Sequence, residues 1–113
     1  ILVNFNDVNL SNCINTIATE NTWATLDQVT NLNCSGQNIS SITGIEQLIN
    51  LDYLDLSNNN LSQISLTAQL TSLVYLDIRG NCATDLETLN STSITTVLKD
   101  PIDKICSSEK IEN

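Results

Sequence analysis

Hydrophobic and polar positions recur along this chain with a period of 22 residues. Val29, Leu51 and Leu73 open three units, which read VTNLNCSGQNISSITGIEQLIN, LDYLDLSNNNLSQISLTAQLTS and LVYLDIRGNCATDLETLNSTS. The same register aligns four more sets of mostly apolar positions: Leu32, Leu54 and Leu76; Cys34, Leu56 and Ile78; Ile39, Leu61 and Ala83; and Ile42, Ile64 and Leu86. A fixed period of this length is typical of a solenoid built from stacked repeats.

Each unit resembles the leucine-rich repeat L-x-x-L-x-L-x-x-N-x-L, whose units run to about 20–29 residues. The resemblance implies an α/β fold: a short right-handed leucine-rich-repeat solenoid with parallel β-strands on its concave face. A solenoid needs a cap at each end, because its last apolar cross-section is otherwise bare. We therefore expect one domain over 1–113, with a helical N-terminal cap at 1–28, three repeats at 29–93, and a degenerate fourth repeat with a C-terminal cap at 94–113.

One position of the repeat carries a side-chain amide, and Gln37, Asn59 and Asn81 occupy it. The chain turns sharply after each short strand, so backbone groups of the turn lack ladder partners. An Asn side chain both donates and accepts hydrogen bonds. We expect Asn59 and Asn81 to satisfy those groups in a buried ladder, with Gln37 as a poorer first rung. The flanking Asn58 and Asn60 are predicted to be exposed turn residues without a special role.

The N-terminal segment has the pattern of a helical cap. Asp7 is a suitable N-cap for a helix whose apolar face comprises Leu10, Cys13, Ile14 and Ile17. A second short helix is expected to begin at Thr25, where Gln28 completes a capping box. Trp23 lies between the two, and we interpret it as a plug of the cap in preference to a binding anchor.

The chain has four cysteines and no histidine, which excludes zinc sites of mixed Cys and His ligands. The close cysteine pairs of an all-cysteine zinc site or a C-x-x-C redox motif are also absent. Two disulfides in an exported protein are the simpler interpretation. Cys13 on the cap helix and Cys34 beneath it favour one bond, and Cys82 and Cys106 favour a second that pins the rear cap. Free thiols, with Cys34 as a buried substitute for leucine, are the alternative.

The segment LDQVTNLNCSGQNISSITGIEQLINLDYLDLSNNNLSQI resembles the start of the repeats in bacterial internalins, which have 22-residue units. In that family a helical cap ends in a similar Leu-Asp-Gln-Val-Thr, and the first repeat has a similar Ile-x-x-Ile-x-Gly-Ile-x-x-Leu. The resemblance covers roughly residues 25–90. This chain differs in having three repeats, cysteines in both flanks and no immunoglobulin-like segment after the repeats. The resemblance specifies the fold better than the function.

Composition and charge exclude several classes of partner. The net charge of −9, with 4 Lys and Arg against 13 Asp and Glu, is opposite to that of a nucleic-acid binder. No apolar stretch approaches the roughly 20 residues of a membrane span, so we expect no membrane insertion. The sequence starts without Met or a signal sequence, so we expect a processed or trimmed form.

Motifs for catalysis are lacking. The chain has no histidine for a catalytic triad, no Gly-rich phosphate loop and no G-x-S-x-G. The only candidate carboxylate pair for hydrolysis is Asp55 and Asp77. We therefore expect neither an enzyme nor a bound cofactor.

Alternation along the strands predicts which side chains line the concave face. Leu54 and Leu56 point inward, so their neighbours point outward. The outward set predicted as ligand-binding comprises Asn33, Tyr53, Asp55, Tyr75, Asp77 and Arg79. The tyrosines should form a two-ring ladder, with the aspartates beside it and Arg79 flanking them. This arrangement fits a recognition surface, since Tyr is enriched in such surfaces. It equally fits a structural role, in which the Tyr pair stabilises the sheet and Arg79 relieves the repulsion between Asp55 and Asp77.

The leading hypothesis is a secreted, cell-surface or periplasmic recognition module that binds a protein or peptide through its concave face. The alternative is a structural spacer without a ligand, or the N-terminal fragment of a larger surface protein, because three repeats offer little area compared with about 800 Å² per partner in a standard interface. A weak cation site at Asp55 and Asp77 is a third hypothesis, although the pair supplies few oxygens and Arg79 competes.

Overall fold

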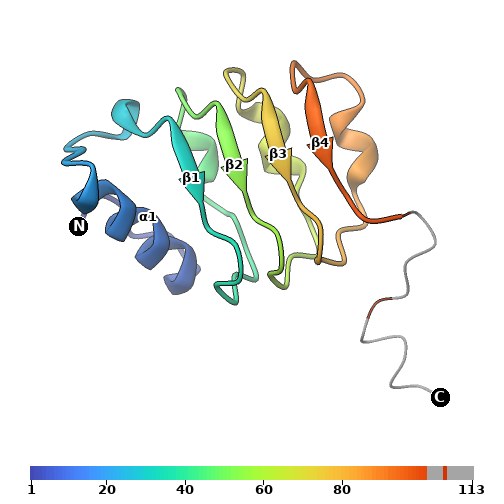
Figure 1. Ribbon diagram of the computed structural model, residues 1–113, viewed down its shortest axis with the longest axis horizontal. Helices are drawn as coiled ribbons and strands as arrows, with labels where there is room; N and C mark the ends of the chain where they lie inside the picture. Colours follow the sequence, from blue (N-terminus) through green and yellow to red (C-terminus); the bar gives the residue numbers. More distant parts are fainter. Residues whose placement is uncertain (102–105, 107–113) are drawn as a thin grey trace.

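Four short parallel strands form one sheet with the order β1-β2-β3-β4 (Figure 1). The computed structural model describes residues 1–101 and Cys106. Each strand belongs to one repeat, and their bounds are β1 Asn31–Asn33, β2 Tyr53–Asp55, β3 Tyr75–Asp77 and β4 Thr96–Leu98. The register aligns Leu32, Leu54, Leu76 and Val97 across the sheet. The fold is thus a leucine-rich-repeat solenoid, as the 22-residue period predicts.

Short 3₁₀ helices connect the strands on the other side of the sheet (Figure 1). They are η2 Ile45–Gln47, η3 Ser65–Gln69 and η4 Leu86–Leu89. The inward leucines and isoleucines of the two sides meet in a continuous core, in which Leu54, Leu56, Leu61 and Ile64 are almost fully buried. Burial of such side chains contributes about 1.5–3 kcal/mol each, so the core holds the strands in place.

Helix α1, Val8–Glu20, covers the N-terminal end of the core as a cap. Leu10, Cys13 and Ile14 are buried on its inner face. A short helix η1, Leu26–Gln28, follows, and the Gln28 Oε1 accepts hydrogen bonds from the backbone N–H groups of Ala24 at 2.5 Å and Thr25 at 3.1 Å. Trp23 is half-buried and packs against the core, in accord with its interpretation as a plug.

Asp7 joins the cap helix to the first repeat. Its Oδ1 accepts from the N–H groups of Asn9 and Leu10, both at 3.0 Å, and its Oδ2 accepts from those of Ser40 at 2.7 Å and Ser41 at 3.1 Å. Partial desolvation raises the pKa of this carboxyl, but the four N–H donors outweigh it and the net pKa is lowered.

We expect Asp7→Ala to lower the free energy of unfolding by about 1–2 kcal/mol at neutral pH, the range for loss of an N-cap. Because the pKa in the folded protein lies below the ordinary value of about 3.9, this stabilisation is present above that value. It is lost as the pH falls through the folded pKa. Urea titrations at neutral and acidic pH should show the difference between wild type and variant shrinking in acid. Glu20→Ala is the control, because it removes an exposed acid at the other end of α1. It should not lower the free energy of unfolding at neutral pH.

The asparagine ladder is present. The Asn59 Oδ1 accepts from the N–H groups of Gln37 at 2.9 Å and Ile39 at 3.0 Å, and its Nδ2 donates to the carbonyls of Cys34, Leu56 and Ser57. Asn81 repeats the pattern: its Oδ1 accepts from Leu61 N–H, and its Nδ2 donates to the Leu56, Ile78 and Arg79 carbonyls. Each amide therefore joins its own turn to the turn of the preceding repeat.

The prediction for Gln37 is wrong. Its side chain is exposed, and its Nε2 donates to the carbonyl of Ser35 in its own turn. The first repeat packs against the cap helix α1, whose backbone groups bond within the helix, so Gln37 has no preceding turn to join. The cap instead reaches the first turn through Asp7 and through Asn9, whose Nδ2 donates to the Asn38 carbonyl at 3.1 Å.

Asn58 also differs from its prediction. It is exposed as expected, but its φ is 58°, and Gly36 at 63° and Gly80 at 75° take the same left-handed conformation at the same repeat position. Asn tolerates this conformation better than most residues with a side chain. Asn58 therefore has the specific role of allowing the turn, and its N–H donates to the Arg79 carbonyl at 2.7 Å.

We expect Gly80→Ala to be destabilising by more than about 2 kcal/mol, since left-handed strain of about 1–2 kcal/mol adds to a steric clash. A Cβ at Gly80 would lie 3.0 Å from both the N and Cα atoms of Asn58. The matched control is Gly36→Ala, where φ is similar but no atom lies within 4 Å of the added Cβ. Chemical denaturation should give a lower free energy of unfolding for Gly80→Ala than for Gly36→Ala. Equal losses would contradict the close stacking of the turns.

The cysteines form two pairs at the two ends of the repeats. Cys13 of α1 is bonded to Cys34, with 5.9 Å between their Cα atoms, and Cys82 is bonded to Cys106, with 5.8 Å between theirs. These are the pairs that the sequence favours. The C-terminal cap expected within 94–113 falls largely outside the described residues, of which only Thr96–Leu98 form a strand there.

Candidate functional site on the concave face

Two stacked tyrosines stand at the centre of the concave face. Tyr53 and Tyr75 are register partners on β2 and β3. Their ring centroids lie 4.4 Å apart and their planes differ by 6°. The two-ring ladder predicted from the sequence is therefore present. The neighbouring strands carry smaller polar residues at this position, Asn31 on β1 and Thr96 on β4.

The three acidic or amide residues at the strand ends share a structural role. The Oδ1 atoms of Asn33, Asp55 and Asp77 each accept from the N–H group two residues later, at 3.2, 2.9 and 3.1 Å. Each side chain thus forms an Asx turn, which starts the bend after its strand. Ser35 and Ser57 add hydroxyl bonds to the first two of these side chains. Sequence reasoning missed this role, although an Asn or Asp at the same position in three repeats is its signal.

Asp77 and Arg79 form a bidentate ion pair. The Arg79 Nε and Nη2 donate to the two carboxylate oxygens of Asp77 at 3.0 and 2.7 Å. The side chain of Asp77 is only 3% exposed, whereas that of Arg79 is 55% exposed. The hydrogen bonds from Arg79 hold the pKa of the Asp77 carboxyl below its ordinary value and raise the pKa of the guanidinium. Asp77 is therefore buried beneath Arg79, and the exposed group of the pair is the guanidinium.

The negative groups of this face also act on Tyr75. Desolvation raises the pKa of its phenol, and the nearby Tyr53 and Asp77 oppose a second negative charge. A phenol is protonated at neutral pH even at its ordinary pKa, so Tyr75 can donate a hydrogen bond there.

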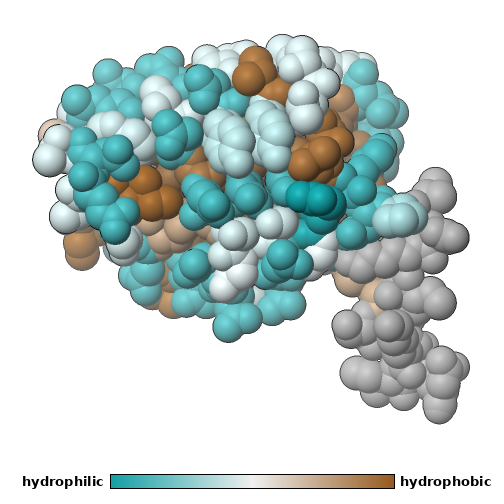
Figure 2. Space-filling model, viewed as in Figure 1, coloured by the Kyte–Doolittle hydropathy of each residue, from teal (hydrophilic) through white to brown (hydrophobic). Residues whose placement is uncertain are grey.

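The predicted site residues thus lie together on one face, but they are not equally accessible. Asn33 and Arg79 are exposed, Tyr53, Asp55 and Tyr75 are half-buried, and Asp77 is 2% exposed. Figure 2, which views the sheet side, shows mostly hydrophilic residues with separate hydrophobic patches. Within the described part of the chain, no cluster of three or more Asp, Glu, Cys or His residues is arranged to hold a metal ion. The groups of this face that reach solvent are therefore an amide, a guanidinium, a carboxylate and two phenol rings.

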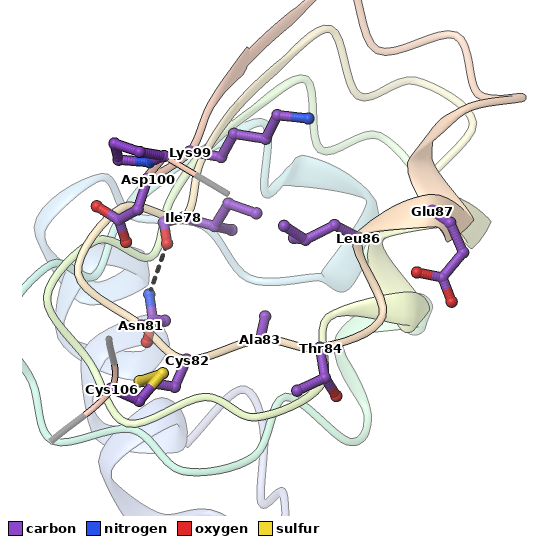
Figure 3. Close-up of a pocket in the computed structure, with 11 residues that line it drawn as sticks. Ile78, Asn81, Cys82, Ala83, Thr84, Leu86, Glu87, Lys99, Asp100 and Cys106 are labelled. Atoms are coloured by element: carbon purple, nitrogen blue, oxygen red, sulfur yellow. Dashed lines mark hydrogen bonds between the residues drawn. A yellow bond between two sulfur atoms is a disulfide. The ribbon is translucent and has the colours of Figure 1, made fainter. Parts of the chain in front are cut away.

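A pocket of about 310 Å³ lies at the C-terminal end of the repeats (Figure 3). Its walls include Ile78, Leu86, Lys99, Pro101 and the Cys82–Cys106 bond. Lys99 and Pro101 stand where Ile78 and Gly80 stand one repeat earlier. Pro has φ near −65°, so the left-handed turn cannot recur there. The pocket is thus the place where the repeat pattern stops, and we do not assign the functional site to it.

Comparison with known proteins agrees with this architecture. A family model for leucine-rich repeats in two copies matches residues 49–91. No curated protein matches the sequence. Of the helices that the described residues form, none has the length and apolar character needed to cross a membrane.

Two solved structures of Listeria monocytogenes proteins are similar to this chain. The internalin InlF has 31% identity and a TM-score of 0.72, over 87% of this chain and 32% of its own. The functional domain of InlJ, which includes a cysteine ladder, has 30% identity and a TM-score of 0.57, over 75% of this chain and 19% of its own. This chain therefore spans about a third or less of either relative. An internalin-like leucine-rich-repeat fold is in general that of a non-enzymatic protein-interaction module. Repeat pattern, fold and relatives together identify the chain as a bacterial-type leucine-rich-repeat protein with internalin-like 22-residue repeats.

Proposed function

We propose that the chain is a recognition module, secreted or exposed at the cell surface or in the periplasm, which binds a protein or peptide through its concave face. The observation that carries the proposal is the stacked pair of Tyr53 and Tyr75 among shorter polar side chains. Two disulfides support an oxidising compartment. The net charge of −9 opposes nucleic acid as the partner.

The concave face has the rigidity that recognition favours. Tyr side chains have few rotatable bonds, so they give a large contact area at a low loss of conformational entropy. The Asx turns hold Asn33 and Asp55, and the ion pair holds the guanidinium of Arg79. We assign direct contact with the ligand to Asn33, Tyr53, Asp55, Tyr75 and Arg79. Asp77 acts by positioning Arg79.

Selection of a displayed peptide library on the immobilised protein tests this proposal. We expect Tyr53→Ala and Tyr75→Ala each to weaken selected binders by about tenfold or more, the range for central aromatic residues of an interface. Ile49→Ala, which truncates a 61% exposed residue outside the strands, is the control and should leave affinity unchanged. Circular dichroism should confirm that all variants are folded. Selected binders that are indifferent to both tyrosine variants would contradict the site assignment.

The alternative is a spacer without its own ligand, or part of a larger surface protein. The Asx turns favour the spacer, because they account for Asp55 and Asp77 without a ligand. A spacer predicts that library selection yields no binder whose affinity depends on the concave residues. The same selection therefore separates the two functions.

A further inference from the structure

The chain carries its positive side chains at one end only. Residues 1–78 contain no Lys or Arg, but they contain Asp7, Glu20, Asp27, Glu46, Asp52, Asp55 and Asp77. On the concave face, Arg79 follows β3 and is already paired with Asp77. The half of this face built from β1 and β2 therefore has carboxylates without a side-chain cation from its own strands.

Asp55 and Asp52 provide the negative charge of this half. Asp55 is half-buried, and its Oδ1 accepts from the N–H and hydroxyl of Ser57. Asp52 is exposed immediately before β2. Asp55 lies two residues after Tyr53 and on the same face of β2, so a cation placed beside Tyr53 would meet its carboxylate. Asp52 adds negative charge just before the strand begins.

Tyr53 presents one side of its ring away from the tyrosine stack. Tyr75 covers the side that faces β3. The side that faces β1 borders Asn31, an exposed residue whose amide donates to the hydroxyl of Thr30 at 3.4 Å. Phe5 and Trp23, the other aromatic residues of the chain, pack against the core near the N-terminal cap. The β1-facing side of Tyr53 is therefore an aromatic surface suited to a cation.

We propose that the concave face recognises a cationic peptide segment, whose Lys or Arg side chain lies against the β1-facing side of Tyr53 and pairs with Asp55. This inference rests on the proposed function and names the chemical class of its ligand. Arg79 follows β3 and its guanidinium repels a second cation there, so the cationic side chain is expected over β1 and β2. Adjacent strands lie about 4.8 Å apart, so an extended peptide, at about 3.3 Å per residue, crosses all four strands in about five residues.

Chemical-shift titration of the isotope-labelled protein tests the proposal, since it detects weak binding and locates it. The probes are three extended peptides of equal length, with Lys-Gly, Glu-Gly and Ser-Gly repeats. We expect the Lys-Gly peptide alone to shift the amide signals of Asn31–Asn33 and Tyr53–Asp55, with an effect that falls as salt is added.

Two pairs of variants isolate the contacts. Asp55→Asn should weaken Lys-Gly binding about two- to fivefold and preserve the fold, because Asn33 forms the same Asx turn one repeat earlier. Glu46→Gln is the matched control: it removes a carboxylate of η2, outside the strands, keeps the Oε1 acceptor for the Gly44 N–H, and should leave binding unchanged. Tyr53→Leu should weaken binding, whereas Tyr53→Phe, which keeps the ring, should retain it.

The outcomes separate this inference from the proposed function. Equal or stronger shifts with the Glu-Gly or Ser-Gly peptide on the concave amides would overturn the cationic ligand and leave concave-face recognition standing. Lys-Gly shifts centred on Arg79, or affinity unchanged by Asp55→Asn, would likewise overturn the cationic ligand. If no peptide shifts the concave amides, the cationic ligand is overturned, and the library selection then decides the proposed function independently.

Discussion

Asn59→Ala should lower the free energy of unfolding by about 3 kcal/mol or more. The substitution removes an acceptor for two backbone N–H groups and a donor to three carbonyls, most of them buried. A buried polar group left without a partner costs about 1–3 kcal/mol, and water has little access beside Ile39 and Leu56, which are fully buried. The midpoint of urea denaturation, followed by circular dichroism, measures the loss.

Asn60→Ala is the matched control for this variant. Asn60 follows Asn59 directly and has the same side chain, but it is exposed. Its known contact is through the backbone, where its N–H donates to the Ile39 carbonyl at 2.8 Å and survives the substitution. A loss for Asn60→Ala as large as that for Asn59→Ala would show that the ladder is not what stabilises the turns.

Reduction of the two disulfides should have the second large effect. The bonds close loops with sequence separations of 21 and 24 residues, each worth about 3 kcal/mol in the chain-entropy description. They lie at the ends of the solenoid, where a terminal repeat has one neighbour instead of two. Since a small domain has only about 5–15 kcal/mol of stability, we expect reductant to lower the Tm substantially.

The double variant Cys13→Ala/Cys34→Ala separates the two bonds. It should be less stable than wild type and should still lose stability in reductant, because the Cys82–Cys106 bond remains. Non-reducing peptide mapping of the wild type should show the pairs Cys13–Cys34 and Cys82–Cys106. Four free thiols in protein from an oxidising compartment, or a Cys34–Cys82 link, would contradict the placement of the caps.

The repeat period predicts most of the fold because it acts through burial. Leu32, Leu54 and Leu76 must all face one core, so their spacing determines the strand positions, the register and the outward residues between them. The Tyr53–Tyr75 stack follows from that register alone. Helix α1 is predictable for a similar reason, since Asp7 and the apolar face that follows are local signals.

Other features depend on contacts that a repeat pattern does not encode. Asp55 and Asp77 are equivalent in the pattern, yet Asp77 is buried because residue 79 is Arg, where the preceding repeat has Ser57. Gln37 occupies the ladder position but faces solvent, because its neighbour is a helix and not a turn. The left-handed φ of Asn58 becomes evident only beside Gly36 and Gly80.

The asparagine ladder has a direction, and this bears on how the chain is made. Asn59 and Asn81 both reach back, to N–H groups of the first and second repeats respectively. While the chain emerges from the ribosome with its N-terminus first, the amides of Gln37 and Ile39 have no acceptor until Asn59 has left the exit tunnel. In the same way, the N–H of Leu61 has no side-chain acceptor until Asn81 has left the tunnel. Each repeat is therefore completed only by the synthesis of the next one, and a released chain truncated just before residue 81 should hold a folded first turn and an unfinished second.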